Sequence, residues 1–158
     1  MAERDGLTIE LVEGDMADLS MFFGERFDLV VNPCSTCFVP NVRPVWREAY
    51  RVLRRGGVLM TGFWNPLGLI FDEDDADRGV LRVRHKLPFS TVTSLTEEEQ
   101  ARRMEAGLPL EFSHSLEDQI GGQIDAGFVI AGLYEDEFPG TELAKYAPAF
   151  IATKAIKI

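Results

Sequence analysis

Residues 27–66 read FDLVVNPCSTCFVPNVRPVWREAYRVLRRGGVLMTGFWNP, and this stretch decides the fold class. It opens with a short apolar run, residues 27–32, which stops at an Asn-Pro pair, as a strand of a parallel sheet covered on both faces would. Apolar residues then recur at helical spacing over residues 41–55, and a Gly-Gly pair can end that helix. A second apolar run, residues 57–64, also stops at Asn-Pro. Strand, helix and strand predict a βαβ unit of a parallel sheet.

The flanking segments extend this pattern. Apolar and polar residues alternate over residues 7–12, which predicts a strand that turns at Gly14. Residues 115–126 predict a helix that ends at Gly127, with Ser115 and Asp118 at capping-box spacing and an apolar stripe of Leu116, Ile120 and Ile124. Two further strands are expected, at residues 128–136 and 148–158. The connection between them is too short for an ordinary helical crossover, so we expect them to be antiparallel.

The segment 65–113 is less regular, and we interpret it as an insertion or lid on a single domain of residues 1–158. It is expected to contain a short strand over residues 80–90 and a helix that starts at Thr96. Its acidic stretch, residues 72–77, fails the calcium-loop pattern because Asp77 stands where that loop requires Gly. We therefore expect a solvated acidic loop and no metal site.

Composition limits the function. The 158 residues, 46% of them apolar, can bury one core. A formal net charge of −10 and a pI near 4.6 argue against nucleic acid as a partner, because such binding depends on clustered Lys and Arg. The N-terminus lacks the apolar core of a signal peptide, and no run approaches the roughly 20 apolar residues of a membrane span. We expect a cytoplasmic protein with no membrane partner.

The stretch 27–66 resembles the second half of class I S-adenosylmethionine-dependent methyltransferases of the small-molecule, ubiquinone/menaquinone-methylase-like group. The shared pattern is a strand opening with Phe-Asp, a loop, a helix closing in Glu-x-x-Arg-Val-Leu-x-x-Gly-Gly, and another strand. LVEGDMADL, residues 11–19, resembles the segment after the family's third strand, and residues 118–136 resemble its late helix and next strand. The resemblance implies a Rossmann-like α/β sheet made of strands three to seven of the family order. It also implies methyl transfer to a small-molecule acceptor, with S-adenosylmethionine as cofactor.

The family's glycine-rich loop and its ribose-binding acidic residue have no counterpart in this sequence. The chain begins at what would be strand three, which suggests that roughly 60–100 residues are missing upstream. In the family order 3-2-1-4-5-7-6, the strand at 7–12 would then lack a neighbour and the strand at 27–32 would be an open edge. We expect this chain alone to bind the cofactor weakly or not at all and to be inactive. The alternative is a non-catalytic binding or regulatory remnant that forms a homodimer through exposed sheet edges.

The resemblance implies the candidate site residues. Cofactor contacts are expected from the turn after strand three and from the end of strand four: Gly14, Asp15, Met16, Ala17, Asn32, Pro33 and Cys34. An ordinary turn role for Asp15 is the competing interpretation. Three further residues are candidates for the substrate pocket: Phe38, Trp64 and His114. No catalytic residue is assigned, because in-line methyl transfer mainly requires positioning.

Cys34 and Cys37, in the sequence NPCSTC, are the two cysteines of the chain. A redox dithiol needs the first Cys at a helix N-terminus, and here the predicted helix starts only at residue 41. A structural zinc site needs about four ligands, and the two histidines lie at unsuitable spacing. We expect the loop to line the cofactor pocket or to be a tightly packed turn with a buried Cys.

Overall fold

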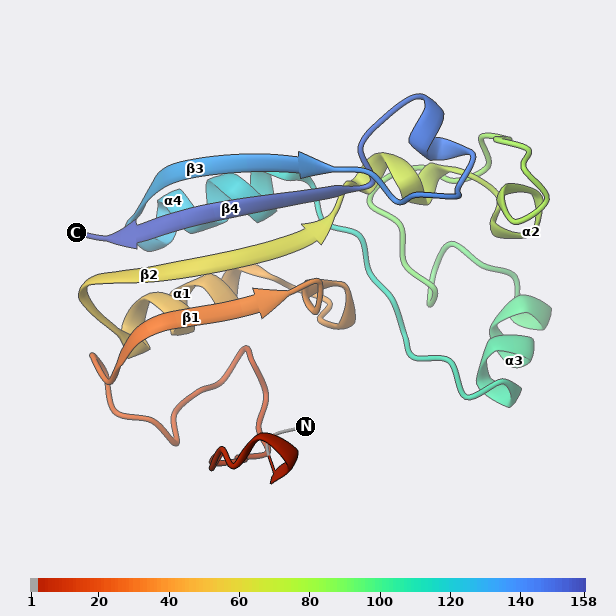
Figure 1. Cartoon of the computed structure of the whole chain (residues 1–158). Helices are drawn as coiled ribbons and strands as arrows, with labels where there is room; N and C mark the ends of the chain where they lie inside the picture. Colours follow the sequence, from red (N-terminus) through yellow and green to blue (C-terminus); the bar gives the residue numbers. More distant parts are fainter. Residues whose placement is uncertain (1–2) are drawn as a thin grey trace.

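The computed structural model describes residues 3–158 and contains a four-stranded sheet (Figure 1). Its strands are β1 (Phe27–Pro33), β2 (Leu53–Trp64), β3 (Phe128–Asp136) and β4 (Phe150–Lys157), in the order β1-β2-β4-β3. β1 and β2 are parallel, whereas β4 is antiparallel to both β2 and β3. The predicted βαβ unit and the antiparallel final pair are therefore confirmed. The order is that of strands 4-5-7-6 in the predicted arrangement.

The strand expected over residues 7–12 does not form. These residues have no strand partner, and Leu7, Ile9 and Leu11 are 63%, 61% and 90% exposed. An apolar alternation becomes a strand only when another strand accepts its backbone hydrogen bonds. Among the described residues, no strand lies beside residues 7–12 to accept these bonds. The predicted open edge at β1 is confirmed, since β1 lies at one end of the sheet.

Helix α1 (Arg43–Val52) crosses between β1 and β2 and buries Val45, Trp46, Ala49 and Val52 against the sheet. The helix ends at Val52 and not at the Gly-Gly pair, because Leu53 has an extended backbone and already pairs with Phe27 of β1. The two glycines lie inside β2. A Cβ on Gly57 would lie 2.8 Å from the Arg54 carbonyl oxygen, so this turn of the strand has no room for a side chain.

The predicted late helix is a π-helical turn (η4, Glu117–Gly121) followed by α4 (Gly122–Ala126), and it ends at Gly127 with φ of 108°. The predicted apolar stripe is wrong: Leu116 and Ile124 are 45% and 55% exposed, whereas Gln119 and Gln123 are buried. A π turn takes more residues than an α turn, which rotates the following residues relative to ideal helical spacing. Two amides therefore face the core, where they make hydrogen bonds.

The middle region, residues 65–113, lies beyond the carboxyl ends of β1 and β2 (Figure 1). It contains η3 (Pro66–Ile70), α2 (Glu73–Ala76) and α3 (Glu97–Glu105). The predicted helix start at Thr96 is confirmed by a complete capping box with Glu99. The strand predicted at 80–90 is wrong: only single bridges form there, Phe71 to Val83 and Ser90 to Phe112. That the region is an insertion or lid stays a prediction.

Three further 3-10 turns lie outside the middle region: η1 (Glu3–Asp5), η2 (Thr36–Phe38) and η5 (Leu143–Lys145).

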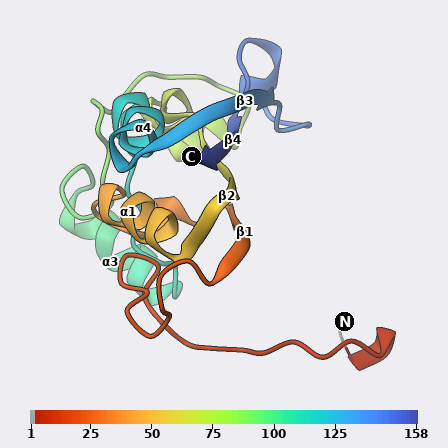
Figure 2. The same cartoon turned by 90° about the vertical axis from the view of Figure 1, so that its left-hand side faces the viewer.

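One face of the sheet is covered and the other is not. Figure 2 shows α1 and α4 on the same side, where the core forms around Trp46, Leu59 and Phe128. On the opposite face Leu29, Val31 and Met60 are 50%, 60% and 48% exposed.

Within residues 3–158, no helix has the length and apolar character needed to cross a membrane.

Candidate functional site

A hollow lies where β1 ends, between the sheet and α1; we call it the strand-end hollow. Its volume is about 230 Å³. Three of the predicted cofactor contacts, Met16, Asn32 and Pro33, meet there. The other lining residues come from the turn before β1, from β1 and β2, from the loop after β1 and from α1: Leu19, Val30, Val31, Ser35, Val45, Trp46, Ala49 and Leu59. Parallel strands place their carboxyl ends at one edge, which is where open α/β sheets hold ligands.

Hydrogen bonds hold Asn32 in position at the rim of this hollow. The Ser35 hydroxyl donates to the Asn32 Oδ1 at 2.6 Å, and Asn32 Nδ2 lies 3.8 Å from the sulfur of Met16. The backbone carbonyl of Asn32 accepts from the Thr61 hydroxyl of β2 at 3.0 Å. Cys34 then takes a left-handed backbone conformation, φ 52°, and its N–H donates to the Gly62 carbonyl at 2.7 Å. This turn redirects the chain away from the sheet.

The turn at residues 14–17 packs beside the hollow. Asp15 Oδ1 accepts the backbone N–H of Ala17 at 2.8 Å, so this carboxylate stabilises its own turn. A Cβ on Gly14 would lie 2.4 Å from the terminal carbon of Met21, which leaves no space for a larger residue unless Met21 moves. Met16 and Ala17 pack against the core cluster. Contact of Gly14, Asp15 and Ala17 with a cofactor stays a prediction.

The two cysteines are free thiols in the loop after β1. Burial raises the pKa of the Cys34 thiol, and burial together with the nearby Glu111 raises the pKa of Cys37. Cys37 Sγ donates to the Cys34 carbonyl at 3.3 Å. Within residues 3–158 no three His, Cys, Asp or Glu side chains are grouped to hold a metal ion. A protonated thiol is a poor nucleophile. Cys34 does not line the strand-end hollow, and its contact with a cofactor stays a prediction.

The three predicted substrate-pocket residues lie in different settings. Phe38 is 48% exposed in η2. His114 is buried, and its Nε2 lies 3.0 Å from the Thr36 carbonyl, so it joins the segment before η4 to the loop after β1. Trp64 ends β2 and lines a different hollow, together with Phe138. A substrate role for these residues stays a prediction.

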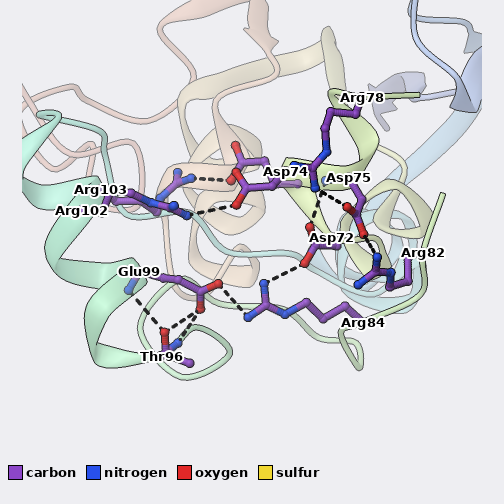
Figure 3. A network of polar contacts seen from close by, with 11 residues as sticks. Asp72, Asp74, Asp75, Arg78, Arg82, Arg84, Thr96, Glu99, Arg102 and Arg103 are labelled. Carbon is purple, nitrogen blue, oxygen red and sulfur yellow. Dashed lines mark hydrogen bonds and ion pairs between the residues drawn. The ribbon is translucent and has the colours of Figure 1, made fainter. Parts of the chain in front are cut away.

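The acidic stretch 72–77 is not simply a solvated loop as predicted. The Asp75 side chain is only 7% exposed and is paired with Arg78 and Arg82. Asp72 pairs with Arg84 at 2.9 Å, and Arg84 continues to Glu99 of α3 at 2.7 Å (Figure 3). The arginines that follow the acidic stretch, at residues 78–84, pair with its carboxylates once the chain folds back. The spacing of residues in the sequence did not indicate these ion pairs. Ion pairs thus tie α2 to α3.

The pKa of Glu99 is lowered from 4.5 to about 2, first by the backbone N–H of Thr96 and then by Arg84. Because the folded-state pKa is lower, Glu99 stabilises the fold fully above its ordinary pKa and loses this effect as the pH falls toward 2. We expect Glu99→Gln to make the free energy of unfolding less dependent on pH in that interval. Urea denaturation at several pH values measures this. Glu98→Gln, which removes the same charge from an exposed neighbouring residue, is the control; equal slopes for both variants would contradict the prediction.

The lining of the strand-end hollow suits one part of S-adenosylmethionine. Its lining is mostly apolar, with the Asn32 amide and the Ser35 hydroxyl as polar groups, which suits a flat, weakly polar ring such as adenine. Among the described residues that line it, none is charged, so it offers no acid for ribose hydroxyls and no ion partner for the amino acid part.

Solved structures and a family model agree with this fold. The model described as a methyltransferase domain matches residues 1–61. An S-adenosylmethionine-dependent methyltransferase from Mesorhizobium loti superposes with a TM-score of 0.64 at 15% identity, over 91% of this chain and 67% of that one. One from Methanosarcina mazei gives 0.57 at 17% identity, over 92% and 65%. The fold is therefore that of the Rossmann-like methyltransferases.

A curated relative is much more similar in sequence. The "Uncharacterized methyltransferase YbaJ" of Bacillus subtilis (strain 168) is 49% identical over 158 residues, which cover all of this chain and 62% of the relative. With the family model and the solved structures, this match agrees with the predicted resemblance to the class I S-adenosylmethionine-dependent methyltransferases. The chain spans 62% of the length of that curated relative.

Sequence reasoning missed several residues of these hollows. Ser35 was part of the quoted loop but had no assigned role, although a Ser three residues after Asn32 can reach its amide. Phe138 lies in the connection between the last two strands, for which the sequence indicates no role, yet it packs on Trp64 with ring centroids 5.9 Å apart. No local signal indicates that pairing, because it depends on how the β3–β4 connection folds back over the end of β2.

Proposed function

We propose that this chain forms part of an enzyme that transfers a methyl group from S-adenosylmethionine to a small-molecule acceptor. The observation that carries the proposal is the strand order β1-β2-β4-β3 with an antiparallel last strand, in a chain 49% identical to a curated methyltransferase. The strand-end hollow supports it further, because it brings Met16, Asn32 and Pro33 together at the edge where such sheets hold ligands.

In this proposal the residues of the chain act by binding and positioning. Asn32, fixed by Ser35 and by the strand pairing of its backbone, presents its amide to the adenine side of the cofactor. Met16 provides an apolar surface beside it. S-adenosylmethionine would supply an activated methyl group, so the protein needs no nucleophile of its own. The substituents that this hollow does not accommodate would be held by a glycine-rich loop and an acidic residue of the family type.

The test uses a longer polypeptide that carries a glycine-rich strand–loop–helix unit of the family ahead of residue 1. We expect it to bind S-adenosylhomocysteine at micromolar concentration, and Asn32→Ala to weaken this binding about tenfold, the size of one hydrogen bond in a partly buried site. Equilibrium dialysis measures the affinity. Asn65→Ala, which removes an Asn at the end of the neighbouring strand β2, is the matched control and should leave the affinity unchanged.

The alternative function is a non-catalytic binding or regulatory protein that dimerises through its sheet edges. The exposed apolar residues Leu29 and Val31 on edge strand β1 favour it, because an unpaired edge can add a strand from another chain. Sedimentation of residues 1–158 separates the two proposals. A stable dimer, together with no cofactor binding by the longer polypeptide, would support the alternative and contradict methyl transfer.

A further inference from the structure

A second hollow lies between the start of the middle region and the β3–β4 connection. We call it the aromatic groove. Its volume is about 770 Å³, within the range of roughly 300–1,000 Å³ usual for small-molecule sites. Six large apolar side chains line it: Trp64, Leu69, Phe71, Leu81, Phe138 and Leu143. The segments that supply them, residues 64–81 and 137–149, are far apart in the sequence, and Figure 1 shows both at the same end of the sheet.

Two aromatic rings that line the groove, Trp64 and Phe138, form a cluster with Phe150 of β4. Trp64 lies 4.5 Å from Phe150 and 5.9 Å from Phe138, measured between ring centroids, and Phe138 lies 5.6 Å from Phe150. Phe138 remains 45% exposed even though it is part of this cluster. Aromatic faces attract both apolar groups and cations, and Trp attracts cations most strongly.

The charges along the groove are mostly negative. Asp77, Glu137 and Glu142 line it, and Lys145 is its one basic lining residue. Lys145 donates to Glu142 at 2.6 Å, so its charge is already neutralised. Asp77 and Glu137 form no ion pair with any residue in the described part of the chain. A cation near these two carboxylates would be favoured, and an anion of the same shape would be repelled.

The wall that carries Asp77 is held in place from α3. The Arg84 guanidinium bridges Asp72 and Glu99, and Arg102 reaches Asp74 at 3.4 Å (Figure 3). These contacts fix the segment between Phe71 and Leu81, which forms one side of the aromatic groove. The carboxylate of Asp77 is thus presented from a supported turn, which lowers the cost of ordering it around a ligand.

The groove also lies close to the strand-end hollow. Pro33 of β1 pairs with Gly62 of β2, and Trp64 is two residues further along β2. With about 3.3 Å per residue and about 4.8 Å between strands, the backbones of Pro33 and Trp64 are roughly 8 Å apart. A ligand in the groove would therefore sit beside the carboxyl ends of both parallel strands.

We propose that the aromatic groove binds a small amphipathic amine, with its apolar body against Trp64 and Phe138 and its ammonium group beside Asp77 and Glu137. Aromatic surface and unpaired carboxylates together select this class: a purely apolar ligand would leave the carboxylates unused, and a carboxylic acid would be repelled by them. The proposal concerns binding alone. It does not depend on methyl transfer, so its test and the cofactor test can fail separately.

The test titrates residues 1–158 with 4-phenylbutylamine and, as the matched anion, 4-phenylbutyrate. NMR of the two tryptophan indole N–H signals reports the site. The Trp64 signal should shift with a dissociation constant of about 1 mM or below for the amine, and the butyrate should bind at least about tenfold more weakly. The signal of Trp46, which is buried and donates to the Asp118 carbonyl, should not move. No saturable shift with the amine, or equal affinity for amine and acid, would overturn the proposal.

A double variant, Asp77→Asn with Glu137→Gln, tests the charge requirement. Both residues are exposed, so the variant should fold, which circular dichroism verifies. We expect it to weaken the amine about tenfold and to leave the butyrate unchanged or slightly tighter. Glu98→Gln with Glu105→Gln makes the same change in net charge on α3 and should affect neither ligand. An equal loss in both double variants would mean that only net charge matters, which contradicts a built site.

Discussion

Calorimetry of residues 1–158 with S-adenosylmethionine or S-adenosylhomocysteine should give no measurable heat at micromolar protein. The strand-end hollow offers an apolar surface, one amide and one hydroxyl, and no charged side chain among its described lining residues. The ribose hydroxyls and the amino acid part of the ligand would lose their buried hydrogen bonds and ion pairs. Each such group contributes on the order of 1–3 kcal/mol, and each 1.4 kcal/mol is about tenfold in affinity. A micromolar ligand would become at best a millimolar one.

The same experiment on Asp15→Ala is the control. If residues 1–158 bind too weakly to detect, this variant changes nothing. Micromolar affinity in residues 1–158 that is lost in Asp15→Ala would contradict the prediction. It would imply that a second copy of the chain, or another of its own segments, supplies the polar and charged contacts that the strand-end hollow does not offer.

Replacing Trp46 by Ala should lower the free energy of unfolding by about 3–5 kcal/mol, as expected for deleting a fully buried Trp. Trp46 is 0% exposed and lies at the centre of the α1–sheet core. Its indole N–H donates to the Asp118 carbonyl at 3.0 Å, and its ring leaves no space for a Cβ on Gly122, which would lie 2.8 Å away. The same side chain thus holds α1 against η4 and α4. Urea denaturation followed by circular dichroism measures the change.

Trp46→Phe and Trp64→Ala are the controls for this prediction. Trp46→Phe keeps most of the ring and loses the hydrogen bond, so about 1–2 kcal/mol is expected. Trp64 is only half-buried, at the rim of the aromatic groove, so its removal should cost less than that of Trp46. A loss below about 1 kcal/mol for Trp46→Ala would show that the α1–α4 contact is not a centre of stability.

Part of the lining of the strand-end hollow could be predicted because the relevant signals are local. An apolar run that stops at Asn32-Pro33 marks a strand end, and strand ends meet at one edge when strands are parallel. Met16 was predicted to lie beside Asn32 and Pro33 from the resemblance of residues 11–19 to the family, and it does line the same hollow. The aromatic groove could not be predicted. Trp64 ends β2, whereas Phe138 lies in the β3–β4 connection, and the two rings meet only through tertiary folding. The ion pairs of Asp72 with Arg84 and of Arg84 with Glu99 were missed for the same reason.

Local signals were enough to predict the elements that are specified within one segment: the strand–helix–strand unit of residues 27–64, the capped helix at Thr96, the stop at Gly127 and the antiparallel final pair. Tertiary structure decided the rest. Residues 7–12 have the pattern of a strand but no neighbour to bond with, so they stay unpaired. Leu53 leaves the helix because it pairs with Phe27. The π turn presents Gln119 and Gln123 to the core, where Gln123 accepts the Thr153 hydroxyl of β4 at 2.9 Å. In each case a hydrogen bond to a distant segment, or its absence, outweighs local propensity.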